Sequence, residues 1–424
     1  MNQCRGGISL YQAPRGTTDI LPEEQAYWLF VEQKAAETGL LYGYQRIDTP
    51  VFEDTHLFTR TTGEFTDIVQ KEMYTFDDRG GNSLTLKPEG TAPICRAYLE
   101  HGMHNLPQPV KLYYFSPIFR YDRPQAGRYR QHFQFGCEAI GNGDPALDAE
   151  LISVAWQFYA ALGLKGLTLS LNSIGCPVCR PNYLKVLADY YAAYGDVLCE
   201  DCTTRLVNNP QRLLDCKKPN CQPIAQAAPG NAEHLCGDCE EHFEKVKKYL
   251  GLLDIPFKLN HRLVRGLDYY TRTVFEIQPE EEGGQSSLGG GGRYDGLIEQ
   301  LGGKPTPGVG FGTGIERIVL NLKKQGVSVP AAEFPPVFIA HIGEKAAEEA
   351  LKLASLLRQV GIGVIAATGQ RSLKAQLRQA NTLGARQAVI IGDDEVKTGT
   401  VILRDMGAAS QESVPAEKLP DLLK

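Results

Sequence analysis

One stretch, Phe119–Gly141, constrains this chain more than any other: FRYDRPQAGRYRQHFQFGCEAIG. Four arginines surround a turn favoured by a proline and a glycine, and the preceding residues are aromatic and extended in character. Beyond the turn the residues alternate, which predicts a strand with one apolar face on a core and one polar face. The polar face carries Gln134, Gly136 and Glu138, and the glycine is expected to leave room for a ligand beside the backbone. The stretch therefore predicts an antiparallel pair with a basic loop and a polar binding floor, the alternative being a solvated edge hairpin.

The composition is typical of a globular protein of two or three domains, with 424 residues, 42% hydrophobic and 22% charged. The amino terminus has no apolar run after a basic start, and no window approaches about 18 uninterrupted apolar residues, so neither a secretory signal nor a membrane span is expected. We therefore expect a cytoplasmic protein, whose eleven cysteines are thiols or metal ligands rather than disulfides. The net charge of −6 argues against a broadly basic nucleic-acid binder, so any RNA contact must come from local basic patches.

Two segments outside the first stretch place polar groups where a ligand could bind. Residues 83–92, SLTLKPEGTA, predict a strand that runs into a turn carrying Glu89 and Thr91. Residues 265–271, RGLDYYT, lie in a region of extended character over 257–277 and combine an arginine, an aspartate and two tyrosines. Either segment alone is weak, because Pro-Glu-Gly turns are common and single tyrosines usually pack on sheets.

Glycine-rich segments follow. Residues 289–296, GGGGRYDG, lack the Gly-Lys-Ser/Thr of a P-loop. In residues 308–314, GVGFGTG, the glycines recur at every second position, which marks one bare face of a strand rather than the turn of a dinucleotide-binding fingerprint. A flat base could approach such a face, and Arg317, one turn into the following helix, could cover its other side.

Together these segments resemble the class II aminoacyl-tRNA synthetases, in the form found in the histidyl-tRNA synthetase family. Residues 119–141 resemble motif 2, residues 308–322 resemble motif 3, and a helix and extended segment over 21–58 resemble motif 1, the dimer interface. RGLDYYT and GGGGRYDG resemble the two histidine-specific signatures. The resemblance covers essentially the whole chain and implies an α+β catalytic domain on a mostly antiparallel sheet over 1–325, working as a homodimer.

The resemblance implies ATP-dependent attachment of L-histidine to its tRNA through a histidyl-adenylate, with Mg²⁺ accompanying the ATP. Arg120 and Arg265 would be the catalytic residues, gripping the α-phosphate from opposite sides with fixed, permanently charged forks. Such a reaction needs positioning and electrostatics and no protein nucleophile. By resemblance, Glu138 and Tyr270 take the imidazole ring, and Glu89, Thr91 and Gln134 take the amine. The full sets are Glu89, Gly90, Thr91, Gln134, Glu138, Tyr269, Tyr270 and Tyr294 for histidine, and Arg120, Arg265, Gly312 and Arg317 for ATP.

Beyond a proline-rich linker at 326–336, alternating strands and helices predict a small α/β domain over 331–424. Arg371, Lys374 and Arg378 recur at i, i+3 and i+7, which predicts one basic face of a helix. Such a stripe is usually a solvated surface, but the domain resembles the anticodon-binding domain of this synthetase subclass. The resemblance implies that tRNA is bound by these three residues and by Arg123 and Gln125 in the motif 2 loop.

Four paired-cysteine turns, CPVC, CEDC, CKKPNC and CGDC, lie within a segment expected to be an insertion over 172–256. The first two pairs fit C-x2-C-x19-C-x2-C, a spacing typical of a structural zinc site. A helix of roughly 20 Å predicted between them would separate these pairs unless the chain doubles back. A combination of later pairs, two sites, and free thiols are the alternatives. The candidate ligands of a structural, non-catalytic zinc ion are Cys176, Cys179, Cys199, Cys202, Cys216, Cys221, Cys236 and Cys239.

The alternative function is that of a catalytically silent synthetase paralogue, serving as a histidine-sensing regulatory subunit. Such proteins keep the fold but typically lose the second signature's catalytic residues and the terminal domain, whereas RGLDYYT and the α/β tail are both present here. A plain RNA-binding module would leave the glycine strand and both signatures unexplained.

Overall fold

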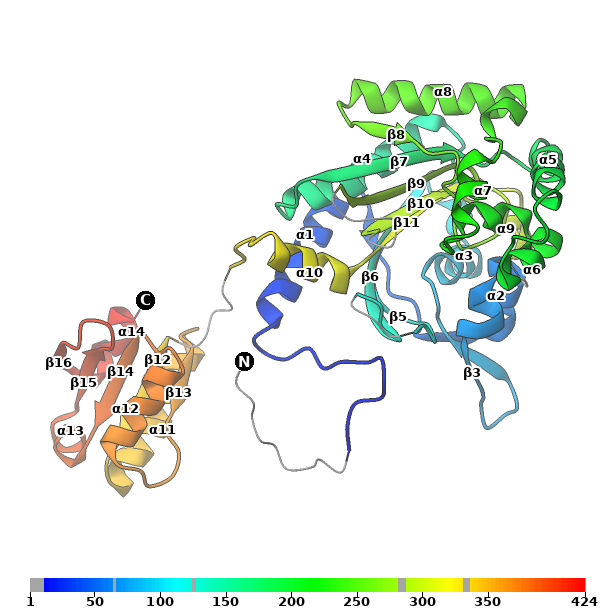
Figure 1. Ribbon diagram of the computed structural model, residues 1–424. Coiled ribbons are helices and arrows are strands. Elements are labelled where there is room, and N and C mark those ends of the chain that lie inside the picture. Colours follow the sequence, from blue (N-terminus) through cyan, green and yellow to red (C-terminus); the bar gives the residue numbers. More distant parts are fainter. Residues whose placement is uncertain (1–10, 64–65, 124–126, 281–286, 331–335, 424) are drawn as a thin grey trace. The chain divides into compact units, whose positions relative to one another are not determined.

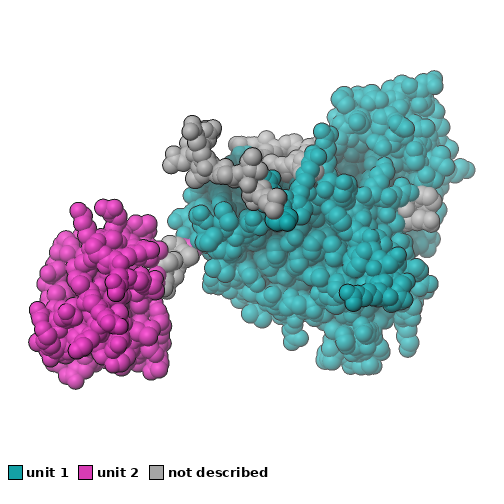
Figure 2. All heavy atoms as spheres, turned by 90° about the horizontal axis from the view of Figure 1, so that it is seen from below, with its two compact units in different colours: residues 1–329 teal, residues 330–424 magenta. Residues whose placement is uncertain are grey.

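The computed structural model describes residues 11–63, 66–123, 127–280, 287–330 and 336–423. The chain divides into two compact units, residues 1–329 and 330–424, which Figure 2 colours separately. None of the helices in the described part of the chain is both long and apolar enough to cross a membrane.

The larger unit is built on an eight-stranded sheet in the order β1-β5-β6-β11-β10-β9-β7-β8 (Figure 1). The strands are β1 Gln45–Arg46, β5 Val110–Phe119, β6 Gln131–Ile140, β7 Leu167–Ser173, β8 Phe257–Leu259, β9 Thr271–Pro279, β10 Gly289–Arg293 and β11 Gly308–Gly314. All neighbours from β5 to β7 pair antiparallel, and only β1 and β8 at the two edges pair parallel. The mostly antiparallel sheet expected from the sequence is thereby confirmed.

One face of this sheet carries the largest apolar core. The covering helices are α1 Gln25–Leu41, α4 Pro145–Ala161, α8 Gly237–Leu252 and α10 Ile315–Lys324. Strand β6 turns Phe135, Cys137 and Ala139 into this core, and the ring centroids of Phe135 and Phe158 are 4.7 Å apart. The alternation read from the sequence therefore places the apolar side of β6 against helices and leaves Gln134 and Glu138 for the other side.

The opposite face carries a second core, built in large part by the insertion. It contains α3 Thr91–Glu100, α5 Arg180–Ala192, α6 Glu200–Asn208, α7 Gln222–Ala227, α9 Leu297–Gln300 and the 3₁₀ helix η3 Pro210–Asp215. Beside it lie α2 Thr55–Thr62 and a small sheet in the order β2-β4-β3, with β2 Phe52–Asp54, β3 Tyr74–Asp77 and β4 Ser83–Leu86.

Two regions expected to be extended differ from that expectation. Residues 42–58 contain two short strands, β1 and β2, and then the start of α2. The helix begins at Thr55 because the Asp54 carboxylate accepts a hydrogen bond from the His56 amide (2.8 Å) and caps it. Residues 257–277 form β8, a loop over 260–270 and then β9, so that RGLDYYT lies largely in a loop.

The insertion returns to the sheet through α8, where a buried ionic network joins it to α4 and to the end of β10. His242 Nε2 on α8 lies 3.1 Å from an oxygen of Asp148 on α4. The same carboxylate pairs with Arg293 at the end of β10, and both of these side chains are fully buried. Arg293 Nε also donates to Asp295 (3.0 Å).

The smaller unit has a five-stranded sheet in the order β13-β12-β14-β15-β16. Its elements are β12 Val337–His341, α11 Glu344–Gln359, β13 Val364–Ala366, α12 Leu373–Thr382, β14 Gln387–Ile391, α13 Asp393–Thr398, β15 Thr400–Asp405, β16 Gln411–Pro415 and α14 Leu419–Leu422. Lys374 and Arg378 are exposed on α12. Arg371 precedes Ser372, whose hydroxyl caps this helix, so the three-residue helical stripe expected from the sequence is wrong at Arg371.

Candidate functional site

A cavity of about 1320 Å³ opens over the polar side of the sheet, between the β5–β6 hairpin, α10 and the insertion. Arg120, Gln134, Arg265, Gly312 and Arg317 line it, so several residues predicted for ligand binding share one space. Further basic residues on its wall are Arg128, Arg205, Arg212, Arg262, Lys217 and Lys218. Asp67 and Asp215 on the same wall pair with Arg205, Arg212 and Lys217, so the lining is mixed in charge with a small excess of cations, which suits a polyanionic ligand.

Arg120 and Arg265 reach this cavity from different elements. Arg120 follows β5, and its Nε donates to the carbonyl oxygen of Pro88 (2.7 Å). Arg265 lies in the loop before β9, and its Nη1 donates to Glu276 (2.9 Å). A Cβ on Gly290 would lie 2.7 Å from the same Nη1, so glycine there makes room for the guanidinium.

The Nε of Arg265 is a buried donor with no hydrogen-bond partner among the described residues. An unsatisfied buried donor of a charged group is costly, on the order of 1–3 kcal/mol or more, and such groups usually mark a place where a ligand or water completes the bonding. The phenol of Tyr270 lies beside this guanidinium. The geometry thus gives Arg265 a fixed position and a free donor.

Deeper in the sheet, the Glu138 carboxylate forms the centre of a fully buried polar cluster. Thr91 Oγ1 donates to one of its oxygens (2.7 Å), and the Tyr294 hydroxyl donates to the other (2.6 Å). Burial raises the pKa of Glu138 to about 8. A Cβ on Gly310, the partner of Glu138 across the β6–β11 ladder, would lie 1.7 Å from its carboxylate. The glycine at position 310 is therefore needed for this carboxylate, beyond any contact with a base.

Glu89 occupies the start of α3. Its carboxylate accepts hydrogen bonds from the amides of Thr91 (2.6 Å) and Ala92 (2.8 Å), an arrangement that stabilises a helix N-terminus. Tyr269 donates its hydroxyl to the same carboxylate (3.3 Å). Burial raises the pKa of Glu89 as well. Glu89 is thus tied to the helix as well as to the predicted amine site.

Tyr114 is the residue that the sequence interpretation missed. Its hydroxyl donates to Gln134 (2.9 Å), and a Cβ on either Gly90 or Gly136 would lie 2.5 Å from its hydroxyl oxygen. The space beside Gly136 that we expected a ligand to fill is therefore taken by the Tyr114 ring. Tyr114 is opposite Gly136 in the β5–β6 register, and the alignment of these two strands is the signal that could have identified it.

At the outer end of the cavity, Arg317 holds two segments together. Its Nε donates to the carbonyl of Gly127 (2.9 Å) and its Nη1 to that of Ser287 (2.5 Å). Gly312 lies beside Gln134, whose Nε2 would be 2.6 Å from a Cβ at that position. Arg123 is exposed in the hairpin loop. Gln125, the other loop residue predicted to bind tRNA, lies outside the described residues.

The eight cysteines of the insertion gather in two groups, Cys176, Cys179, Cys236 and Cys239 in one, and Cys199, Cys202, Cys216 and Cys221 in the other. The single C-x2-C-x19-C-x2-C site suggested by spacing is therefore wrong, because α5 separates its two halves. Instead, the Cys176–Cys179 pair meets the Cys236–Cys239 pair, and the Cys199–Cys202 pair meets Cys216 and Cys221.

Comparison with known proteins extends these observations over the full chain. The family described as Histidyl-tRNA synthetase matches residues 16–176 and 219–318, and the Anticodon binding domain family matches residues 336–424. A histidine–tRNA ligase of Dehalococcoides mccartyi is 62% identical over 410 residues, which cover 97% of this chain and 98% of that protein. One from Pelotomaculum thermopropionicum is 53% identical over 411 residues, covering 97% of each.

Among solved structures, the apo histidyl-tRNA synthetase of S. aureus is similar over 98% of this chain and 100% of that chain, with a TM-score of 0.82 and 38% identity. The residues that match these two families include the strands around the Glu138 cluster and nearly all of the smaller α/β unit. On the strength of these matches, this chain belongs to the histidyl-tRNA synthetase family.

Proposed function

We propose that this chain attaches L-histidine to its tRNA at the expense of ATP, through a histidyl-adenylate. The observation that carries the proposal is the pairing of a cavity lined by Arg120, Gln134 and Arg265 with a buried Glu138 carboxylate, which lies four residues after Gln134 on the same side of β6. Members of this family take histidine, ATP with Mg²⁺ and tRNA as substrates. The site contains groups suited to the side chain of histidine and to phosphate.

The Glu138 cluster suits the imidazole ring. A ring N–H would donate to the carboxylate, whose geometry Thr91 and Tyr294 already fix, and the Tyr270 phenol would face the other nitrogen. Gln134, Glu89 and Thr91 would take the amine, with Gly90 and Tyr269 shaping the wall. A buried site built to pair both ring nitrogens rejects isosteres that lack them, because its own polar groups would be left unpaired.

Arg120 and Arg265 would act on the α-phosphate of ATP. The histidine carboxylate attacks this phosphorus in line while pyrophosphate leaves, so two anions must be aligned and their charge screened. The Nε of Arg265, which has no hydrogen-bond partner in the described part of the chain, would donate to an incoming oxygen. Arg317 and Gly312 would hold the adenine between them.

Mg²⁺ would arrive with ATP and neutralise phosphate charge. Glu72 and Asp122 line the cavity and supply the carboxylate oxygens that this ion prefers. No step assigned here to the protein side chains requires a covalent intermediate with the enzyme.

ATP–pyrophosphate exchange with each of the standard amino acids tests the function. Histidine is expected to drive exchange without tRNA, since all the adenylate-forming groups lie within residues 1–329. Faster exchange with any other amino acid would overturn the assignment.

The alternative, a silent paralogue acting as a regulatory subunit, gains no support from the comparisons. The relatives that are 62% and 53% identical over nearly the full chain are both named as ligases. Exchange activity in the purified protein decides between the two functions.

We also propose a cytoplasmic homodimer. The segment resembling motif 1 exposes large apolar side chains, among them Leu29, Leu40, Leu41, Val51 and Phe52, which a second copy would cover. Light scattering of the purified protein should give twice the mass of one chain, and a monomer at micromolar concentration would contradict the dimer.

Removing residues 330–424 should separate the two half-reactions. A chain ending at Val329 retains both cores of the larger unit, so it should keep histidine-dependent exchange. It should lose most of its tRNA charging efficiency, because the anticodon-binding surface is gone. Full charging at low tRNA concentration would show that the smaller unit is not the anticodon reader.

Lys374 and Arg378 on α12 refine this prediction, since both are exposed. Alanine at both positions should weaken tRNA binding and flatten its salt dependence by about one unit for each tRNA phosphate that the variant no longer neutralises. Lys352→Ala on α11 is the control, an exposed lysine of the same unit outside the predicted stripe.

The insertion over 172–256, finally, is proposed to bind zinc in a structural role. Its cysteines supply the thiolate ligands that zinc prefers in a cytoplasmic protein. The adenylate chemistry already has its cations in the arginines and in Mg²⁺.

A further inference from the structure

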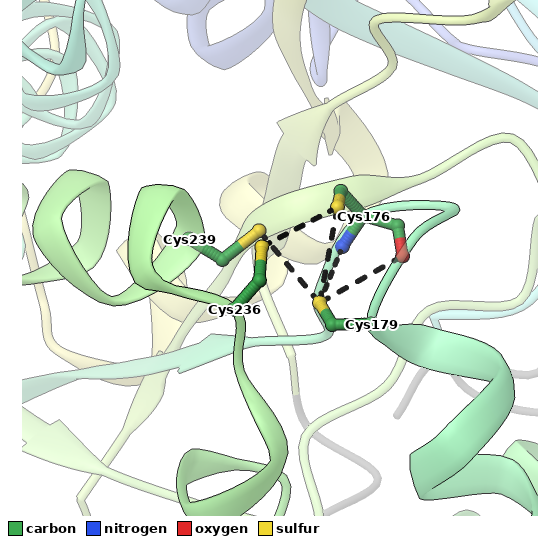
Figure 3. A group of neighbouring side chains, drawn as sticks. All are labelled: Cys176, Cys179, Cys236 and Cys239. Carbon is green, nitrogen blue, oxygen red and sulfur yellow. Dashed lines mark hydrogen bonds between the residues drawn. The ribbon is translucent and has the colours of Figure 1, made fainter.

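The two cysteine groups are separate in space and built from different elements. In the first, Cys176 and Cys179 come from the loop between β7 and α5, while Cys236 and Cys239 come from the start of α8 (Figure 3). In the second, Cys199 and Cys202 begin α6, Cys216 follows η3, and Cys221 precedes α7.

Within each group the sulfurs are spaced as ligands of one ion. In the first group the Sγ–Sγ distances are 3.8 Å for Cys176–Cys179, for Cys176–Cys236 and for Cys179–Cys239. In the second, Cys199 and Cys216 are also 3.8 Å apart. Four sulfurs about 2.3 Å from a zinc ion, at the corners of a tetrahedron, lie about 3.8 Å from one another.

These distances fit one ion better than a disulfide or a cluster of several irons. A disulfide brings its sulfurs to about 2.05 Å, and all eight cysteines are free. An iron–sulfur cluster places several irons and sulfides between its cysteines, which holds the thiolates further apart than a single ion does. A closed set of four thiolates around one ion is the arrangement of structural zinc.

We propose that the insertion binds two zinc ions in two separate tetracysteine sites, one formed by Cys176, Cys179, Cys236 and Cys239 and the other by Cys199, Cys202, Cys216 and Cys221. This assignment rests on the proposed binding of zinc and fixes its stoichiometry and the pairing of its ligands. It replaces the pairing of adjacent motifs that spacing alone suggests.

Hydrogen bonds support the first site and connect it to the loop that carries RGLDYYT. The amide of Cys176 donates to the Cys179 sulfur (3.3 Å), an interaction that favours a thiolate. Arg180, the next residue, donates through Nη2 to the carbonyl of Tyr270 (2.6 Å) and to that of Gly175 (3.0 Å). An ion here would join α8 to the loop after β7 and so fix one neighbour of the proposed histidine pocket.

The second site has the same features. The Cys199 amide donates to the Cys221 sulfur (3.4 Å). The 3₁₀ helix before Cys216 carries Arg212, whose Nη1 donates to the backbone carbonyl of Arg265 (3.2 Å). An ion here would link three short elements of the second core, α6, η3 and α7, and its binding would add to their folding energy.

Metal analysis of the full-length wild-type protein is the first test. Plasma mass spectrometry should find about two zinc ions per chain, and Co²⁺ added to the metal-free protein should saturate at about two equivalents with the strong visible bands of tetrahedral thiolate ligation. One ion, none, or iron in place of zinc would each overturn the proposal.

Crossed double variants test the pairing. Cys179→Ser with Cys239→Ser removes ligands from one proposed site and should leave about one zinc ion, whereas Cys179→Ser with Cys202→Ser damages both and should leave none. If adjacent motifs paired instead, these two results would be exchanged. Cys95→Ser is the matched control, a buried free cysteine outside both groups that should retain both ions.

A variant that fails to fold does not decide the question, because the wild-type stoichiometry and the cobalt titration stand without any substitution. Failure of the proposed function is separately visible. A protein with two zinc ions and no histidine-dependent exchange would support the metal sites and overturn the proposed function. An active protein without zinc would support the proposed function and overturn the metal sites.

Discussion

Replacing Arg265 by histidine is expected to slow histidine-dependent pyrophosphate exchange by about 10²-fold or more, the scale for losing one aligned charge at a transition state. The guanidinium is held by Glu276, and its buried Nε has no hydrogen-bond partner among the described residues, so its loss would remove a preorganised donor to the phosphate. The effect should appear in kcat, with the dissociation constant of histidine changed little, because Arg265 lies outside the Glu138 cluster.

Equilibrium binding of histidine, measured together with exchange kinetics, shows whether Arg265 acts on the phosphate of ATP or belongs to the amino-acid pocket. If binding collapses while turnover survives, Arg265 belongs to the amino-acid pocket. Arg79→His is the control, since Arg79 is an exposed arginine in the hairpin between β3 and β4, away from the cavity lining.

Glu138→Gln is expected to raise the KM for histidine on the order of 10²-fold, because the amide replaces one acceptor oxygen of a buried carboxyl group by a donor and leaves buried donors unpaired. Thr91 and Tyr294 both donate to this carboxylate, and an amide nitrogen cannot accept from either. Exchange rates over a range of histidine concentrations measure the change. An unaltered KM would remove Glu138 from the histidine site, and Glu150→Gln on α4 is the control.

The stability of the same variant shows whether the pocket remains folded. Burial raises the pKa of Glu138 from 4.5 to about 8, so between these values the folded chain keeps a proton that the unfolded chain releases. Raising the pH through this window therefore lowers the free energy of unfolding of the wild type. The amide does not titrate, so Glu138→Gln should gain stability relative to the wild type between about pH 5 and about pH 8 in urea unfolding.

The alternation in β6 was sufficient to predict which side chains enter the helix-covered core and which lie on the polar side of the sheet. Phe135 and Cys137 lie among the helices, and Glu138 faces the opposite side. A period of two is a local property of an extended chain, and it holds once the strand is recognised. For the same reason the α/β character of the smaller unit followed from patterns within single segments, whereas the mostly antiparallel sheet was expected from the resemblance to class II synthetases.

What could not be predicted depends on the register or on the return path of the chain. Tyr114 fills the space beside Gly136 because β5 and β6 align at those positions, and nothing within LYYFSPIF singles it out. Cys179 meets Cys239 because the insertion comes back through α8, about sixty residues later. Arg371 falls outside α12 because Ser372, the residue after it, is the N-cap of that helix.

The network of His242, Asp148 and Arg293 has a consequence for engineering and for descent. An excision of residues 172–256 would remove His242 from a carboxylate that is sealed from water, and would uncover apolar surface on α4. The cysteine-bearing segment is therefore not a detachable accessory that could be grafted between relatives as a cassette. A transplant would have to carry its counterparts on α4 and β10 with it, so these distant parts of the chain should have been inherited as a set.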